Sequence, residues 1–123
     1  MDDTALQQLA TAWIRLHREE NGSAARKKEL WSFDKLWDLC RSDPDAAWKV
    51  ILEIVRRQPE EKILANLAAG PVEDLLVYHG NLVLPWMIQY CVEHPDFAKV
   101  LAMVWRNDMT DDVWNGLQKL ISR

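Results

Sequence analysis

The feature that most constrains the fold is a succession of short amphipathic segments separated by residues that cap or break helices. Apolar residues recur every three or four positions over residues 6–16, 30–40 and 47–55. This spacing is typical of helices that bury one face. No stretch alternates apolar and polar residues clearly enough to indicate a strand. The sequence therefore predicts an all-α fold.

Capping residues mark the first helix boundaries. Thr4 is expected to cap the first helix, and the break at residues 21–23 separates it from the second. Asp43 precedes Pro44, a pair typical of a new helix start. We thus expect the third helix to begin at Pro44.

Proline and glycine set the later boundaries. The Gly70-Pro71 pair is expected to end a short helix that begins near Pro59, because proline cannot continue the hydrogen-bond ladder. Pro71 then begins another helix, which stops at His79-Gly80. Further helices are expected over residues 84–93, 95–106 and 111–121, the last capped by Thr110.

An internal similarity organises these helices. The pattern Cys-x-x-x-Pro-Asp-x-Ala occurs at residues 40–47 and again at 91–98, and the alignment continues through residues 49–67 and 99–117. Two copies of one helical unit predict a compact, HEAT-like α-solenoid of about seven to eight short helices with two related halves. Chance similarity between two capped helices is the alternative, because Pro-Asp is common at helix starts.

The length of 123 residues predicts a single domain. Within it we expect an N-terminal helix over residues 1–22, a first helical unit over 30–70 and a second over 71–123.

The charge of the chain limits the classes of partner that it is expected to bind. The chain carries 15 Lys and Arg against 19 Asp and Glu, and most of the net charge of −4 lies in residues 63–123. A nucleic-acid binder needs clustered basic residues, so this balance argues against one. It favours a basic protein partner for the second half.

The sequence offers little catalytic chemistry. Cys40 and Cys91 occupy matching helix ends, where two buried thiols are the simplest interpretation. His17, His79 and His94 lack the spacing of zinc ligands, and no phosphate loop or hydrolase motif is present. We expect no cofactor and no metal. No segment predicts a signal peptide or a membrane span, so a cytoplasmic protein is expected.

Acidic residues offer one candidate surface. Glu73 with Asp74, and Asp111 with Asp112, form adjacent pairs, and Asp108 lies close to the second pair in sequence. Acids are favoured in the first turn of a helix by its dipole alone, which is the structural interpretation. The functional interpretation is a surface that guides a basic protein partner.

Seven tryptophans also need an explanation. Five are predicted to fill the core, either because they fall inside the apolar arcs of their helices or because they align with apolar residues of the other copy. These are Trp13, Trp37, Trp48, Trp105 and Trp114. Trp31 is predicted to point outward, where it either covers the first helix or binds a partner. Trp86 follows Pro85 at a helix start, and both interpretations stay open for it.

The segment Gly70-Pro71-Val72-Glu73-Asp74-Leu75-Leu76, with Trp37-x-Leu39-Cys40 and Pro44-x-x-x-Trp48, resembles a family of small uncharacterised bacterial helical proteins. The resemblance covers roughly residues 30–120 and implies no established activity. In general character the chain is similar to bacterial immunity proteins, an analogy of type.

These observations give a leading hypothesis and two alternatives. The leading one is an immunity protein that neutralises a co-encoded antibacterial toxin, a basic protein, through Trp31, Trp86 and the acidic residues. The first alternative is a small hydrolase or transferase that uses Glu73, Asp74 and His79. The second is a helical-repeat adaptor subunit.

Overall fold

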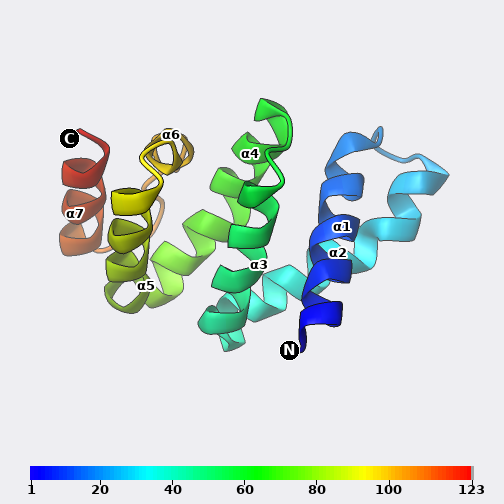
Figure 1. Cartoon of the computed structure of the whole chain (residues 1–123), viewed down its shortest axis with the longest axis horizontal. Coiled ribbons are helices and arrows are strands. Elements are labelled where there is room, and N and C mark those ends of the chain that lie inside the picture. Colours follow the sequence, from blue (N-terminus) through cyan, green and yellow to red (C-terminus); the bar gives the residue numbers. More distant parts are fainter. Residues whose placement is uncertain (123) are drawn as a thin grey trace.

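The structure, a computed structural model, describes residues 1–122, and within that range it contains helices and no strand. The elements are α1 (Asp3–Arg18), α2 (Ala24–Ser42), α3 (Pro44–Arg56), α4 (Glu61–Leu67), the π-helix η1 (Ala68–Val72), α5 (Glu73–Glu93), α6 (Phe97–Leu101) and α7 (Asp111–Ile121). The chain advances along the long axis of the molecule, from α1 and α2 through α3 and α4 to α5, α6 and α7 (Figure 1). The predicted all-α fold is confirmed.

Side-chain caps begin most of the longer helices. The side chains of Ser23, Asp43 and Thr110 accept hydrogen bonds from the backbone N–H groups of Arg26, Ala46 and Val113. Gly22 has a φ of +79°, which suits the predicted break. The Thr4 cap is wrong. Asp2 caps α1 instead, because its carboxylate reaches the N–H of Ala5 at 2.8 Å and the helix already begins at Asp3.

The Gly70-Pro71 pair does not end a helix as predicted. The chain passes from α4 through η1 into α5 without leaving helical geometry. A π-turn contains one extra residue, and this shift in hydrogen bonding accommodates a proline that lacks an N–H. The carbonyl of Pro71 accepts a hydrogen bond from the Cys40 thiol across 3.6 Å, which ties η1 to α2.

His79 bends α5 rather than stopping it. Its backbone is non-helical at φ −138° and ψ 31°, and the helix resumes at once, well before the predicted start at residue 84. The imidazole Nε2 of His79 donates to the Arg41 carbonyl at 3.0 Å, so the bend lies where α5 is held to α2. The next residue, Gly80, lets α7 approach closely. A Cβ there would lie 2.5 Å from Val113 Cγ2.

The predicted helix over residues 95–106 is much shorter. α6 ends at Leu101, and the chain then crosses to α7 as a loop in which Asn107 has a φ of +49°. The loop buries Val104 and Met109 against the core and turns Trp105 outward. The apolar spacing predicted a helix here, but Val104 and Met109 are buried from a loop and not from a further helical turn.

The core runs through both halves, and it contains fewer tryptophans than predicted. Trp13 and Trp48 are buried, as expected, and Trp114 is half-buried. Trp37 and Trp105 are exposed, so their core assignment is wrong. On α2 the buried side is formed by Ser32, Leu36, Leu39 and Cys40, and Trp37 lies just outside it. For Trp105 the cause is the loop that replaces the predicted helix.

Candidate protein-binding surfaces

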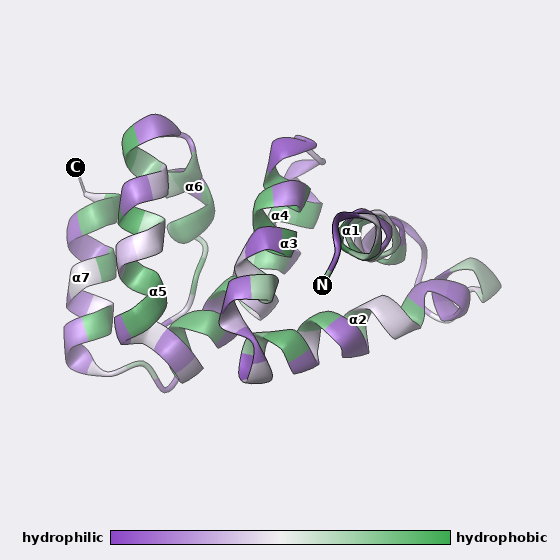
Figure 2. Ribbon diagram, turned by 60° about the horizontal axis from the view of Figure 1, so that its bottom comes forward, coloured by the Kyte–Doolittle hydropathy of each residue, from purple (hydrophilic) through white to green (hydrophobic). Residues whose placement is uncertain are grey.

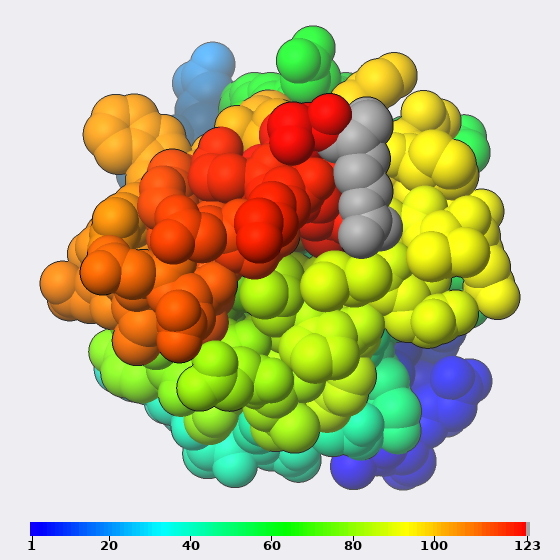
Figure 3. Space-filling view, turned by 90° about the vertical axis from the view of Figure 1, so that its left-hand side faces the viewer, coloured from blue at the N-terminus to red at the C-terminus, as the bar shows by residue number. Residues whose placement is uncertain are grey.

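The end of the molecule formed by α5, α6 and α7 exposes one large aromatic side chain. Trp105 is 77% exposed, the highest value among the exposed large hydrophobic residues. With Met103 and Trp114 it lines an open hollow of about 380 Å³. Figure 3 faces this end, with the loop and α7 in orange and red next to α5 in yellow-green. This aromatic group is available to a partner.

Carboxylates gather around the same loop. Arg106 forms an ion pair with Asp111 in the first turn of α7, and Asn107 Nδ2 donates to Glu73 Oε2 at 3.1 Å in the first turn of α5. Asp108 and Asp112 are exposed. The loop thus links the starts of α5 and α7. We name Trp105 with Glu73, Asp108, Asp111 and Asp112 the C-terminal surface.

Asp74 lies apart from these carboxylates. It forms an ion pair with Arg41 of α2 at 3.3 Å, and both side chains are mostly buried. Burial raises the pKa of the Asp74 carboxyl, and the nearby Arg41 guanidinium opposes that shift. The same guanidinium lies 3.4 Å from the centre of the Trp37 ring and 4.6 Å from that of Tyr78. Asp74 therefore holds α5 against α2.

Glu73, Asp74 and His79 do not form a shared catalytic group. Glu73 contacts Asn107, Asp74 contacts Arg41, and His79 donates to the Arg41 carbonyl. A general acid and base must both reach one substrate position. Each of these three side chains instead makes a different structural contact, so they do not face one common substrate position.

Cys40 lies at the floor of a small apolar cavity of about 40 Å³ between Phe33 and Trp37 of α2 and Gly70 and Pro71 of η1. Burial raises the pKa of its thiol to about 12, and Asp74 adds to the shift. The thiolate is the nucleophilic form, so Cys40 is inert at neutral pH.

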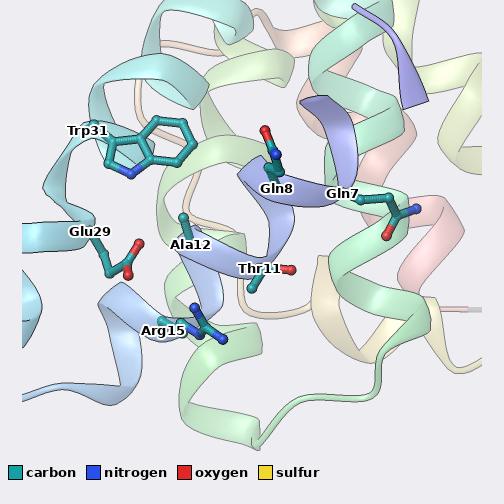
Figure 4. A pocket seen from close by; sticks show the side chains of 7 residues that line it. All are labelled: Gln7, Gln8, Thr11, Ala12, Arg15, Glu29 and Trp31. Carbon is teal, nitrogen blue, oxygen red and sulfur yellow. The ribbon is translucent and has the colours of Figure 1, made fainter. Parts of the chain in front are cut away.

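Trp31 points outward, as predicted. It is 48% exposed and lines an open hollow of about 370 Å³ with Ala12, Arg15 and Glu29. Figure 4 shows the indole directed toward α1. Trp31 covers part of α1 while one side stays open, and its role in binding a partner stays a prediction.

Trp86 is half-buried. It lines a hollow of about 440 Å³ with Trp48, Tyr90 and Glu93, next to the start of α3. This hollow lies away from the C-terminal surface residues, none of which lines it.

Sequence reasoning missed three exposed residues on one side of α2. Leu30, Phe33 and Trp37 are 47%, 46% and 45% exposed. Their spacing of i, i+3 and i+7 was visible but was assigned to the core. The basic run at residues 26–28 and the acid between them, Asp34, are the signals that indicate an exposed side. We name these three residues the α2 stripe.

Two features are absent from the described residues, 1–122. No group of three or more His, Cys, Asp or Glu side chains is placed to hold a metal ion. No helix in this range combines the length and apolar character needed to cross a bilayer.

No curated protein and no solved structure matches the chain. A family model does match, and it covers residues 18–123, which include α2, η1 and the C-terminal surface. This extends the range suggested by the motifs of residues 30–120. The chain belongs to a family of unknown function, DUF6869.

Proposed function

We propose that this protein is a protein-binding module, and specifically a bacterial immunity protein that neutralises a co-encoded antibacterial toxin by direct binding. The observation that carries the proposal is the 77% exposure of Trp105 beside a group of carboxylates. Exposed aromatic residues in such positions dominate binding energies, and a charged rim increases the association rate of a partner of opposite charge.

The electrostatics favour a basic partner. Asp108 and Asp112 are exposed, and Arg106, the cation nearest to them in sequence, is paired with Asp111. The net charge of −4 adds a long-range attraction for a basic partner. A basic toxin domain fits this surface, with Trp105 as its exposed aromatic contact.

A HEAT-like solenoid with two related halves is part of the proposal. Asp43 and His94, at matching positions of the two similar segments, have φ/ψ values of −147°/76° and −131°/75°. Both end a helix by donating to the carbonyl four residues earlier. The shared turn supports a common helical unit, and helical repeats present extended surfaces to partners.

The proposal is tested with the product of the neighbouring gene. We expect that product to co-purify with the chain and to lose its toxicity in the complex. Reversing two charges, Asp111→Lys with Asp112→Lys, is expected to weaken binding at least about tenfold at low salt and less at high salt.

Glu19→Lys with Glu20→Lys is the matched control, because both residues are exposed, follow α1 and give the same change in net charge. It is expected to preserve binding. Failure to bind any neighbouring gene product overturns the proposal. A complex in which the partner keeps its activity supports the adaptor alternative instead.

A further inference from the structure

The hollow beside Trp86 lies apart from the C-terminal surface, and the proposed function leaves it unused. It is open, has a volume of about 440 Å³, and lies between the start of α3 and the second half of α5. In Figure 2 this half of α5 stands next to α6 and α7, and α3 and α4 stand across from it. Trp86, Tyr90 and Glu93 follow the spacing i, i+4 and i+7, so they lie on one side of α5. An indole, a phenol and a carboxylate therefore line the same hollow.

The same three groups hold a guanidinium near the start of α5. The Arg41 guanidinium lies 3.4 Å from the centre of the Trp37 ring and 4.6 Å from that of Tyr78, and it forms an ion pair with Asp74 at 3.3 Å. A planar cation suits all three contacts, because aromatic faces attract it and a carboxylate accepts its N–H groups. This cluster shows which chemical group an indole, a phenol and a carboxylate can bind together.

In the hollow beside Trp86 the chain supplies no such cation. None of the described residues that line it is a lysine, arginine or histidine. Its second carboxylate, Asp45, pairs with Lys49 at 3.1 Å. Glu93 is exposed and forms no ion pair with another residue of 1–122. An unpaired carboxylate thus shares this hollow with aromatic rings.

A second hollow, of about 580 Å³, shares the phenol and the carboxylate with the first. The charged side chains that it adds have partners of their own, since Arg56 pairs with Glu53 at 2.8 Å and Asp96 with Lys99 at 3.6 Å. The His94 ring stacks on the phenol at 4.3 Å between centroids. The apolar lining consists of Val55, Pro59, Leu64, Pro95, Phe97 and Val100. A ligand held in the first hollow therefore has an apolar surface next to it.

We propose that the hollow beside Trp86 binds the side chain of an arginine in an exposed segment of a partner protein. The guanidinium lies against Trp86 and Tyr90 and pairs with Glu93, and an apolar neighbour of the arginine enters the second hollow. A protein segment is favoured over free arginine, because no cation among the described lining residues would pair with a free α-carboxylate. The proposal does not rest on the toxin-binding proposal, since the C-terminal surface is not part of this site.

Titration of a blocked tripeptide, with arginine between two leucines, into the purified chain tests the proposal. The indole N–H signals of the seven tryptophans are followed by NMR at pH 8, and a Trp86→Phe variant assigns one of them. The Trp86 signal is expected to shift with a Kd in the millimolar range, and the Trp31 signal should stay in place. The same peptide with citrulline keeps the shape of arginine without its charge. It is expected to bind at least about tenfold more weakly.

Glu93→Gln tests the carboxylate. The side chain is exposed and unpaired, so folding is expected to persist, and a circular dichroism melt checks this. The variant is expected to bind the arginine peptide at least about fivefold more weakly and the citrulline peptide as the wild-type chain does. Glu20→Gln is the matched control, because Glu20 is also exposed, follows α1 and gives the same change in charge. It should bind both peptides as the wild-type chain does.

Four results would overturn the inference. Three of them are a Trp86 signal that does not move, a citrulline peptide that binds as tightly as the arginine peptide, and a Glu93→Gln variant with wild-type affinity. The fourth is free L-arginine that binds more tightly than the blocked peptide, because the ligand would then be a small molecule and not a protein segment.

Discussion

Residues 40–57 and 91–106 start from the same kind of turn and end differently. α3 continues for 13 residues, whereas α6 stops after five. Along α3 the helix buries Trp48, Ile51 and Ile54. In the second segment the helix ends at Leu101, and the chain becomes a loop. Position 105, which aligns with the half-buried Val55, is therefore occupied by an exposed tryptophan.

The start of each segment explains part of this difference. The Asp43 carboxylate accepts a hydrogen bond from Ala46 N at 3.2 Å and so caps α3. His94 caps through its backbone carbonyl, which accepts from Phe97 N at 3.0 Å, while its ring stacks on Tyr90. In the second segment the main chain of His94 thus takes the place of the side-chain cap that Asp43 provides in the first. Two similar turns therefore lead to similar helices only where the capping group and the packing of the neighbouring elements are also similar.

The second segment also has a different neighbour, because α7 approaches α5 closely at Gly80, and Gly80→Ala tests this contact. A Cβ at Gly80 would lie 2.5 Å and 2.9 Å from the two γ-carbons of Val113, a buried and stiff side chain. We expect Gly80→Ala to lower the free energy of unfolding by about 1–3 kcal/mol. Denaturant unfolding measures the change.

Gly70→Ala is the control for this prediction, since a Cβ there meets nothing within 4 Å. Its free energy of unfolding should be unchanged or slightly higher. Equal stabilities for the two variants would show that α7 is not positioned by Gly80.

The two caps provide the next comparison. Asp43→Ala removes the side-chain acceptor for Ala46 N and is expected to cost about 1 kcal/mol. His94→Ala keeps the backbone acceptor and loses only an exposed ring contact, so about 0.5 kcal/mol or less is expected. Thermal unfolding of both variants checks the order, and a larger loss for His94→Ala would contradict it.

The two cysteines are expected to react with a thiol reagent at different rates. Cys40 is buried and its thiol pKa is raised to about 12, so it stays protonated at pH 8. Cys91 is only half-buried. A thiol reagent added to the native protein at pH 8 is expected to label Cys91 first and to leave Cys40 unmodified until the chain unfolds. Faster labelling of Cys40 would mean that η1 opens readily from α2.

Local signals in the sequence predicted most helix starts, because a cap depends on residues three positions apart. Asp43 and Thr110 were assigned in this way, and the predicted break at residues 21–23 contains the third capping residue, Ser23. The exposure of Trp37 was not predictable from periodicity, since the buried side of α2 is set by its neighbours α1, α3 and α5. The passage through Gly70-Pro71 also escaped prediction, because a π-turn has no simple sequence signal. For the candidate site, the acidic residues were found but Trp105 was not, since its exposure depends on where α6 ends.

The central claim of the proposed function is that the C-terminal surface, through Trp105 and its carboxylates, binds a basic protein partner. Isothermal titration of the co-purifying partner into the wild-type chain, Trp105→Ala and Trp31→Ala tests it most directly. Both tryptophans are exposed, and the first half of α2 and the loop before α7 lie at opposite ends of the molecule (Figure 1), so the second variant controls for loss of an indole. We predict that Trp105→Ala raises the Kd roughly thirtyfold or more, the loss of about 2 kcal/mol expected of a central aromatic contact, and that Trp31→Ala stays near the wild-type value. Equal affinity of Trp105→Ala and the wild-type chain would contradict the account.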